Sequence, residues 1–342
     1  MTDHALLDSL LKGQIPAVAR AVSVVENSRA GFESILSEIQ SHIGNARRIG
    51  ITGPPGAGKS TLSVALVAAW RAQGLKVAVI AVDPTSPFTG GALLGDRIRM
   101  ERVALDPGVF IRSMATRGSL GGLATATREV ADVLDAAGFD RILIETVGVG
   151  QSELDVARMA DSTVLVLVPE SGDGIQALKS GVMEIADLYV INKADRPGAP
   201  KLQREIELAL DLRSGKAFRN LPAHHGALRA AREAARAEEK GWRPPVLQAV
   251  AARDEGIDAI IETLDRHWDA IAEDGTLARR RKDRLAERTR AVVDRAVHRW
   301  LWNDGPAGFL VGARLDAAGD RRVNPYEVAA EVVAAIKEGA RV

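Results

Sequence analysis

The chain has 342 residues, and its 45 lysines and arginines balance 45 aspartates and glutamates, so its net charge is zero. This balance gives no overall field that would attract nucleic acid or a membrane surface. The absence of cysteine excludes disulfides, thiolate zinc sites and thiol catalysis. There is no apolar run near the ~20 residues that span a bilayer, and the N-terminus does not read as a signal peptide. We expect no nucleic acid or membrane partner, and a cytoplasmic location (mitochondrial matrix if the source is eukaryotic).

Residues 1–47 are the first predicted part, a helical extension. Apolar residues recur along it three or four positions apart, which is typical of helices with one buried face. These positions are Leu6, Leu7, Leu10, Leu11, Val18, Val22, Val25, Ile35, Leu36 and Ile39.

Residues 48–270 are the second part, in which short β-branched runs alternate with helical segments. This alternation predicts an α/β fold with a mostly parallel sheet and helices on both faces. In such a sheet, ligands bind beyond the carboxyl ends of the strands. The predicted strands are Ile49–Thr52, Val77–Val82, Val109–Arg112, Ile142–Glu145, Val164–Val168, Leu188–Asn192 and Val246–Val250.

The first predicted strand ends in a glycine-rich loop that opens into a helical run from Thr61 to Ala72. Glycines let the backbone curl so that its N–H groups point at a polyphosphate, aided by the positive end of the helix. Lys59 can reach the β- and γ-phosphates, and the Ser60 hydroxyl can coordinate Mg²⁺. The spacing predicts a nucleoside triphosphate site of the P-loop NTPase kind rather than a glycine-rich turn with a surface lysine. Its residues are Gly53, Pro54, Pro55, Gly56, Ala57, Gly58, Lys59, Ser60 and Thr61.

Acidic residues close two of the following strands. Asp83 ends the second predicted strand and is expected next to the glycine-rich loop. Glu145 and Gly148 resemble the Asp-x-x-Gly switch of GTPases, with Glu in place of Asp. The carboxylate can hold the Mg²⁺ shell, and the Gly148 N–H can meet the γ-phosphate. Val149 stands where Ras-like proteins have the glutamine that orients water, so we expect slow hydrolysis that a partner accelerates.

The sixth predicted strand ends in Asn192-Lys193-Ala194-Asp195, which identifies the nucleotide base. The Asp195 carboxylate can accept hydrogen bonds from N1–H and the 2-amino group of guanine, and adenine offers neither donor there. A site built on such a polar contact can reject the analogue that lacks it by about 10⁴. The Lys193 stem can lie against the base, and the Asn192 amide can tie this loop to the phosphate loop. The sequence therefore predicts GTP and GDP as ligands.

Residues 271–342 are the third part, a predicted helical arm. A helix with apolar positions from Leu285 to Leu301 is followed by a predicted break over Asn303–Gly312. A final helix runs from Tyr326 to about Lys337, and Asn324-Pro325 precedes it as a capping sequence. Such an arm can pack against a second subunit or serve as cover for the sheet.

Three segments together resemble the MeaB/ArgK family of P-loop GTPases, and the likeness extends over nearly the whole chain. The segments are Asp83–Met100, Glu145–Glu153 and Asn192–Asp195, which match in order and spacing. The resemblance implies a GTPase chaperone for an adenosylcobalamin-dependent acyl-CoA mutase, with methylmalonyl-CoA mutase as the commonest client. It implies gating of cofactor loading and removal of damaged cofactor, GTP hydrolysis accelerated by the mutase, and homodimerisation through the C-terminal arm.

The resemblance also assigns roles to residues. For catalysis it implies Lys59, Asp96, Glu145 and Gly148, and for Mg²⁺ it implies Ser60, Asp83, Asp96 and Glu145. The segment Pro169–Lys179 resembles an additional mobile loop of the family, for which a surface loop with solvated charges is the alternative. Candidates for signalling to the partner are Gln151, Asp173, Gln176 and Lys179.

One stretch departs from the family pattern. Relatives close the guanine pocket with a Ser-Ala pair and a Gly-x-Gly-Ile element, whereas this chain has Val250 for the serine and Asp254 for the first glycine. Guanine O6 is met there by backbone N–H, which Ala251 or Ala252 can still provide.

Other functions remain open from the sequence. A small-molecule kinase would transfer phosphate to a substrate instead of water, although the guanine motif argues against an ATP-dependent kinase. A metallochaperone GTPase would need clustered His and Cys, and this chain has six histidines, no cysteine and one adjacent pair, His224-His225. A nucleotide-dependent binding module that only scaffolds a partner is the third alternative.

Overall fold

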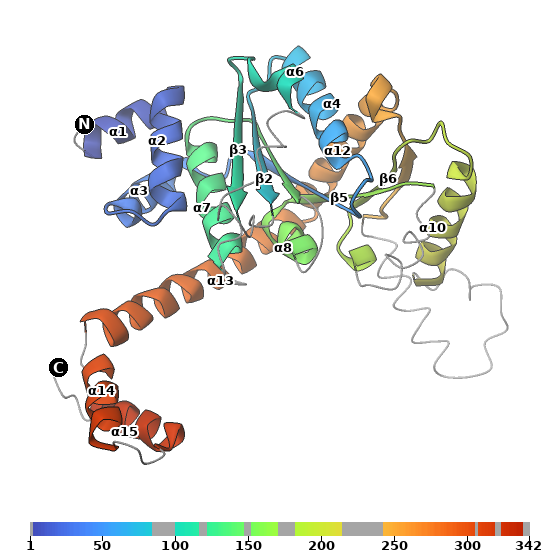
Figure 1. Cartoon of the computed structure of the whole chain (residues 1–342). Coiled ribbons are helices and arrows are strands. Elements are labelled where there is room, and N and C mark those ends of the chain that lie inside the picture. Colours follow the sequence, from blue (N-terminus) through green and yellow to red (C-terminus); the bar gives the residue numbers. More distant parts are fainter. Residues whose placement is uncertain are drawn as a thin grey trace, which may run out of the picture. The chain divides into compact units, whose positions relative to one another are not determined.

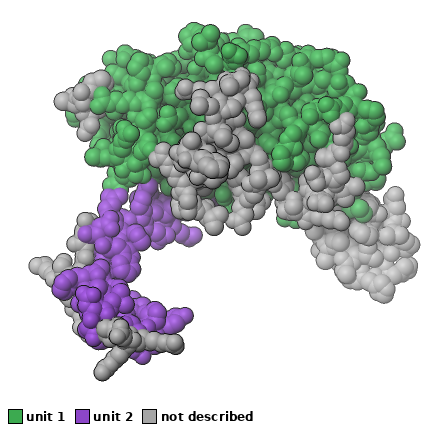
Figure 2. Space-filling view, in the orientation of Figure 1, with its two compact units in different colours: residues 1–280 green, residues 281–342 purple. Residues whose placement is uncertain are grey.

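The structure is a computed structural model, and it describes residues 3–83, 100–115, 122–146, 152–169, 182–213, 242–304, 307–318 and 323–337. The chain forms two compact units, Met1–Arg280 and Arg281–Val342 (Figure 2). The first unit contains the sheet and the helices that flank it (Figure 1).

Seven strands form one sheet in the order β3-β2-β4-β1-β5-β6-β7, and every neighbouring pair is parallel. Each coincides with a predicted strand, with ends displaced by at most three residues. The strand predicted to reach Val250 ends two residues earlier, at Gln248, and Val250 pairs with Glu255 in an isolated bridge. The strands are β1 (Arg47–Thr52), β2 (Val77–Asp83), β3 (Val109–Ala115), β4 (Arg141–Thr146), β5 (Ser162–Leu167), β6 (Leu188–Ile191) and β7 (Val246–Gln248).

Helices cover both faces of this sheet, because alternate strand residues point to opposite sides. Val79 and Leu143 pack in one core, and their neighbours Ile80 and Ile142 pack in another. The predicted α/β architecture is confirmed. On the side of Val79 lie α4 (Lys59–Ala72), α6 (Glu101–Ala104) and α12 (Ile257–Glu273); on the other lie α7 (Gly122–Ala136), α8 (Ser152–Met159) and α10 (Ala199–Arg213).

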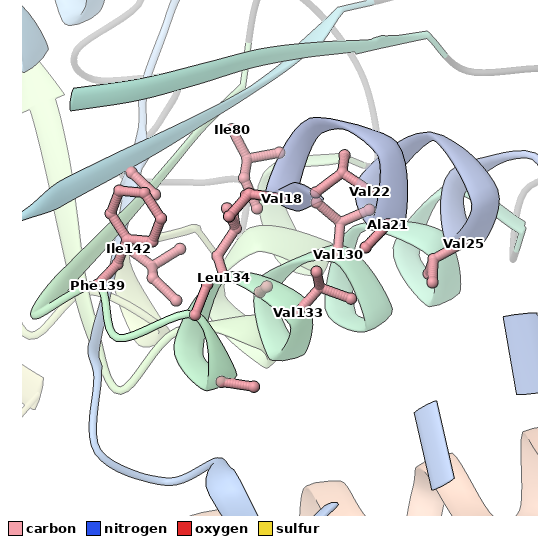
Figure 3. Close-up of a cluster of buried hydrophobic side chains, with 14 of the residues drawn as sticks. Val18, Ala21, Val22, Val25, Ile80, Val130, Val133, Leu134, Phe139 and Ile142 are labelled. Atoms are coloured by element: carbon pink, nitrogen blue, oxygen red, sulfur yellow. The ribbon is translucent and has the colours of Figure 1, made fainter. Parts of the chain in front are cut away.

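The N-terminal extension is helical, as predicted, and it adds a layer outside α7. Val18, Val22 and Val25 of α2 face Val130 and its neighbours on α7 (Figure 3). The same core continues inward to the sheet, so these helices share the hydrophobic core of the nucleotide-binding fold. The elements are α1 (Asp3–Leu11), α2 (Ile15–Glu26), α3 (Phe32–Glu38) and a 3₁₀ turn, η1 (Ile39–His42).

A buried carboxylate joins this extension to the sheet. Asp135 of α7 accepts hydrogen bonds from the backbone N–H groups of Gly44, Asn45 and Ala46 at 2.8–3.1 Å, just before β1 begins. Arg48 of β1 pairs with the same carboxylate at 3.1 Å and with Asp132 at 2.7 Å. Burial opposes the charge of Arg48, but these carboxylates raise its pKa overall.

A second polar cluster lies where β5 and β6 begin, at the edge of the sheet opposite the predicted ligand site. Ser162 Oγ lies 2.7 Å from His267 Nδ1, and Arg280 places Nη2 3.0 Å from the Asp187 carboxylate. Burial acts to raise the pKa of Asp187, but His267 and Arg280 outweigh it and hold the pKa below its ordinary value. The cluster ties α12 and the first turn of α13 to the strands.

The second unit consists of helices with little core. Along α13 (Thr276–Arg299) no described side chain is buried. A π-helical turn (Trp300–Asp304), α14 (Ala307–Ala318) and α15 (Pro325–Lys337) follow, and Arg314 pairs with Glu331 between the last two. The predicted break over Asn303–Gly312 is therefore too long. Isolated glycines inside a helix cost only about 1 kcal/mol each relative to alanine, which does not prevent α14 from forming.

Across the described parts of the chain, we find no helix both long and apolar enough to cross a bilayer.

Candidate nucleotide-binding site

The predicted ligand residues that the structure describes lie at the carboxyl ends of strands in the same sheet. The phosphate-loop candidate follows β1, the acidic residue Glu145 is in β4 beside it, and Asn192 follows β6. The chain moves from β1 to strands on one side and returns to β5 on the other, so β1 lies where the strand order reverses. In parallel α/β sheets this is the place where ligands bind.

Two glycines give the glycine-rich loop its shape. Gly53 has φ 139°, and a Cβ there would lie 2.2 Å from the Val166 carbonyl oxygen of β5. Gly58 has φ 84°, and its Cβ would lie 2.4 Å from Asn192 Nδ2. Only glycine combines these positive φ angles with such close approaches. The loop therefore packs directly against β5 and against the predicted guanine motif.

Lys59 begins α4, so its ammonium lies near the positive end of a helix, beside the loop that precedes it. Its side chain is buried, and Nζ donates to the carbonyls of Gly53 at 2.7 Å and Pro54 at 3.1 Å. The loop thus has a positive charge at its centre, which suits an anionic ligand.

Glu145 connects β4 to the first turn of α4. Its Oε1 accepts a hydrogen bond from Ser60 Oγ at 2.6 Å, and its Oε2 accepts one from Ser63 Oγ at 2.7 Å. Glu145 and Ser63 are buried. A hydroxyl and a carboxylate side by side are oxygen donors of the kind that Mg²⁺ prefers, so these residues fit that ion. Ser63 is absent from the sequence predictions, because its partner is 82 residues away in the chain.

Asn192 joins three loops. Its Nδ2 donates to the carbonyl of Ala57 in the glycine-rich loop at 2.9 Å, and its Oδ1 accepts from the N–H of Ala251 at 3.1 Å. The side chain is 3% exposed. The predicted tie to the phosphate loop is present. The Ala251 N–H is already engaged, which leaves the exposed Ala252 as the better candidate for guanine O6.

The other residues of the guanine motif are near the surface. Lys193 has φ 54° and donates from Nζ to the carbonyl of Gly56 at 2.8 Å, so its stem extends along the phosphate loop. The Asp195 carboxylate is about half exposed and lies 3.1 Å from Arg253 Nη2.

The stretch that departs from the family pattern has a physical explanation. Asp254 has φ 58°, a left-handed conformation that glycine adopts freely and that aspartate tolerates better than most residues. Its carboxylate pairs with Arg102 at 2.9 and 3.1 Å, and this pairing raises the pKa of that guanidinium.

Seven predicted residues lie wholly or partly outside the part of the chain that the structure describes. Asp83 ends β2, and nothing is described of its side chain. Six others lie outside the described residues: Asp96, Gly148, Gln151, Asp173, Gln176 and Lys179. His224-His225 lies outside them as well, and within the described ranges no group of three His, Asp or Glu residues is arranged to hold a metal ion.

A parallel sheet with a glycine-rich loop after β1, a lysine at the start of α4 and a guanine motif after β6 defines a P-loop GTPase. A family model described as methylmalonyl-CoA mutase-associated GTPase MeaB matches residues 18–305. The chain belongs to the MeaB family.

Similar proteins agree with this assignment. A Pyrococcus abyssi protein that carries a provisional GTPase name is 50% identical over 288 residues, covering 84% of this chain and 83% of its own. GTPase ArgK of Escherichia coli is 36% identical over 292 residues, covering 84% and 82%. A crystal structure described as an LAO/AO transport system kinase is 28% identical, covers 98% of this chain and 99% of its own, and has a TM-score of 0.64.

Proposed function

We propose that this GTPase is a Mg²⁺-dependent chaperone of an adenosylcobalamin-dependent acyl-CoA mutase. It gates the loading of the cofactor and protects or reactivates the mutase, and the mutase accelerates GTP hydrolysis in return. The family description, which names association with methylmalonyl-CoA mutase, supports this class of partner.

The observation that carries the nucleotide part of the proposal is the position of Asn192. One buried amide contacts both the glycine-rich loop and the Ala251 loop, so phosphate and base sites are held at a set separation. A nucleotide that binds both sites benefits from this fixed geometry, because the two loops lose little conformational freedom on binding. Asp195 then reads guanine, with Lys193 along the base and the Ala252 N–H at O6.

Ser60 and Glu145 are the described residues that would hold Mg²⁺. Bound there, the ion would neutralise charge on the β- and γ-phosphates. Ser63 holds the second oxygen of Glu145, so the first oxygen keeps its direction toward Ser60. Lys59 contributes a positive charge to the γ-phosphate as charge develops on it. Asp96 and Gly148 complete the proposed catalytic set, together with Asp83 at the metal.

We further propose that residues 271–342 form a homodimer arm. Large apolar side chains of α13 and the following turn are exposed, and few of the described residues in this compact unit are buried. Their spacing of three, four, seven and eight residues places them on one helix face. A second copy of the chain would cover them. They are Leu285, Val292, Val293, Val297 and Trp300.

The test is GTP hydrolysis by the purified protein, alone and with each candidate mutase. A low basal rate that one mutase raises several-fold supports the proposal and identifies the client. The Lys59→Ala variant is the control for contaminating activity, because it removes the phosphate-binding charge. If no mutase changes the rate while a small molecule becomes phosphorylated, the kinase alternative replaces the chaperone proposal. Light scattering measures the dimer in the same samples.

A further inference from the structure

The carboxylate that is expected to read guanine already has a partner in this chain. Arg253 Nη2 lies 3.1 Å from Asp195 Oδ2, and Arg253 Nε lies 3.3 Å from Glu255 Oε1. The guanidinium therefore bridges two carboxylates, one in the loop after β6 and one in the loop after β7. All three side chains are about half exposed, so the contact is open to solvent and to a ligand.

The chemistry of this pair matches the chemistry of the base. Guanine presents N1–H and the 2-amino group, two parallel donors on one carbon, to a carboxylate. An arginine guanidinium presents the same pattern of N–H donors in one plane. A guanine that binds both carboxylate oxygens competes with Arg253 for Oδ2 of Asp195. We propose that Arg253 is an internal competitor of guanine at Asp195 and thereby sets the affinity and base selectivity of the site; this inference rests on the proposed function.

The surrounding contacts hold Arg253 in place. It ends a 3₁₀ turn, η4 (Ala251–Arg253), whose first N–H is fixed by Asn192. The residue after it, Asp254, has a left-handed conformation and pairs with Arg102 of α6 through exposed side chains, not with Arg253. The fixed N–H of Ala251 places the turn beside the loop after β6, where Arg253 reaches Asp195. Glu255 remains as its partner when guanine displaces it, so the displaced guanidinium is not left without a carboxylate.

The size of the effect follows from the exposure of the pair. The free energy that an exposed ion pair contributes is small, and it corresponds to a factor of about 1.4 to 5 in an equilibrium constant. The ion pair therefore lowers the affinity for guanine nucleotides by this factor. Adenine nucleotides make no hydrogen bond to Asp195, so their affinity is unaffected. Salt screens an exposed ion pair, so this reduction in guanine affinity becomes smaller as the ionic strength rises.

The experiment compares Arg253→Ala with wild type in the full-length protein, by calorimetric titration of GDP and ADP. The expected result is a GDP dissociation constant lowered about 1.4- to 5-fold, with ADP binding unchanged and a smaller gain at high salt. Arg102→Ala is the matched control, because it removes a neighbouring arginine that pairs with Asp254 on the same loop instead of with Asp195. Its GDP affinity should not rise.

A second variant distinguishes an effect of the Arg253–Asp195 ion pair from a general effect of the substitution on the loop. In Asp195→Asn the amide can donate to the 2-oxo group of xanthine, so xanthosine diphosphate becomes the probe. Adding Arg253→Ala to this variant should have no effect on binding, because the ion pair is already lost. Weaker or unchanged GDP binding by Arg253→Ala alone would overturn the proposal, as would an equal gain in the Asp195→Asn background. If wild type and every variant fail to bind GDP, the proposed GTPase function fails instead.

Discussion

The side chain of Asn192 offers the sharpest test of the site, because it contacts both the phosphate loop and the base loop, through hydrogen bonds of 2.9 and 3.1 Å. In Asn192→Ala the carbonyl of Ala57 and the N–H of Ala251 lose their partner. Both residues are buried. Each orphaned group costs about 1–3 kcal/mol, so the two together cost about 2–6 kcal/mol.

This cost divides between folding and nucleotide binding, and both are measurable. A loss of about 1.4 kcal/mol of binding free energy corresponds to a tenfold higher GDP dissociation constant. We expect at least that loss in calorimetric titration, together with a lower free energy of unfolding in urea. Asn27→Ala is the matched control. It removes the hydrogen bond from Nδ2 to the Ser23 carbonyl at 2.8 Å, in the N-terminal extension. It should affect stability and leave GDP binding unchanged.

An Asn192→Ala variant that binds GDP within about twofold of wild type and unfolds at the same urea concentration would contradict this prediction. That result would mean that the three loops hold their positions without the amide.

Three further predictions concern buried polar groups. Ser63→Ala removes the hydrogen bond to Glu145 Oε2, about 0.5–1.5 kcal/mol. It should raise the Mg²⁺ concentration that is needed to slow GDP release, and an unchanged Mg²⁺ titration would contradict a role of Ser63 at Glu145. Asp135→Asn breaks a buried pair and should lower the free energy of unfolding by about 3 kcal/mol with unchanged GDP affinity, as measured by urea unfolding and titration. The pKa of Asp187 is lower in the folded protein than in the unfolded chain. Its contribution to stability is therefore complete above the unfolded pKa of about 3.9 and is lost as the pH falls through the folded pKa. Asp187→Asn should make the Tm depend less on pH in the acid range, as measured by thermal unfolding.

Local patterns were sufficient for the strands and for the two nucleotide motifs. Seven β-branched runs separated by helical segments predict a parallel sheet, since each strand must bury both faces. Gly53–Ser60 and Asn192–Asp195 are recognisable because each works through backbone geometry and side chains within one short loop. Strand ends and the start of α14 were less predictable, because hydrogen-bonding neighbours and packing decide them.

Long-range partners within the site could not be predicted in this way. Nothing in the spacing relates Ser63 to Glu145, since the two meet only when α4 packs beside β4. The same holds for Arg253, which reads as a surface charge until the loops after β6 and β7 bring it to Asp195. From the sequence, Asp254 is only a departure from the glycine of the family pattern. Its backbone angle and its Arg102 partner are known only from the structure.

The sequence by itself determined the class of fold, the order of its strands along the chain, and the expected nucleotide. These depend on periodicity and on short motifs whose chemistry is complete within a few residues. The tertiary structure decided the order of strands in the sheet, the shared core of the N-terminal helices, and which charged groups meet at Asp195 and Glu145. Such contacts join residues far apart in the chain, and they exist only because helices and strands pack at close distance.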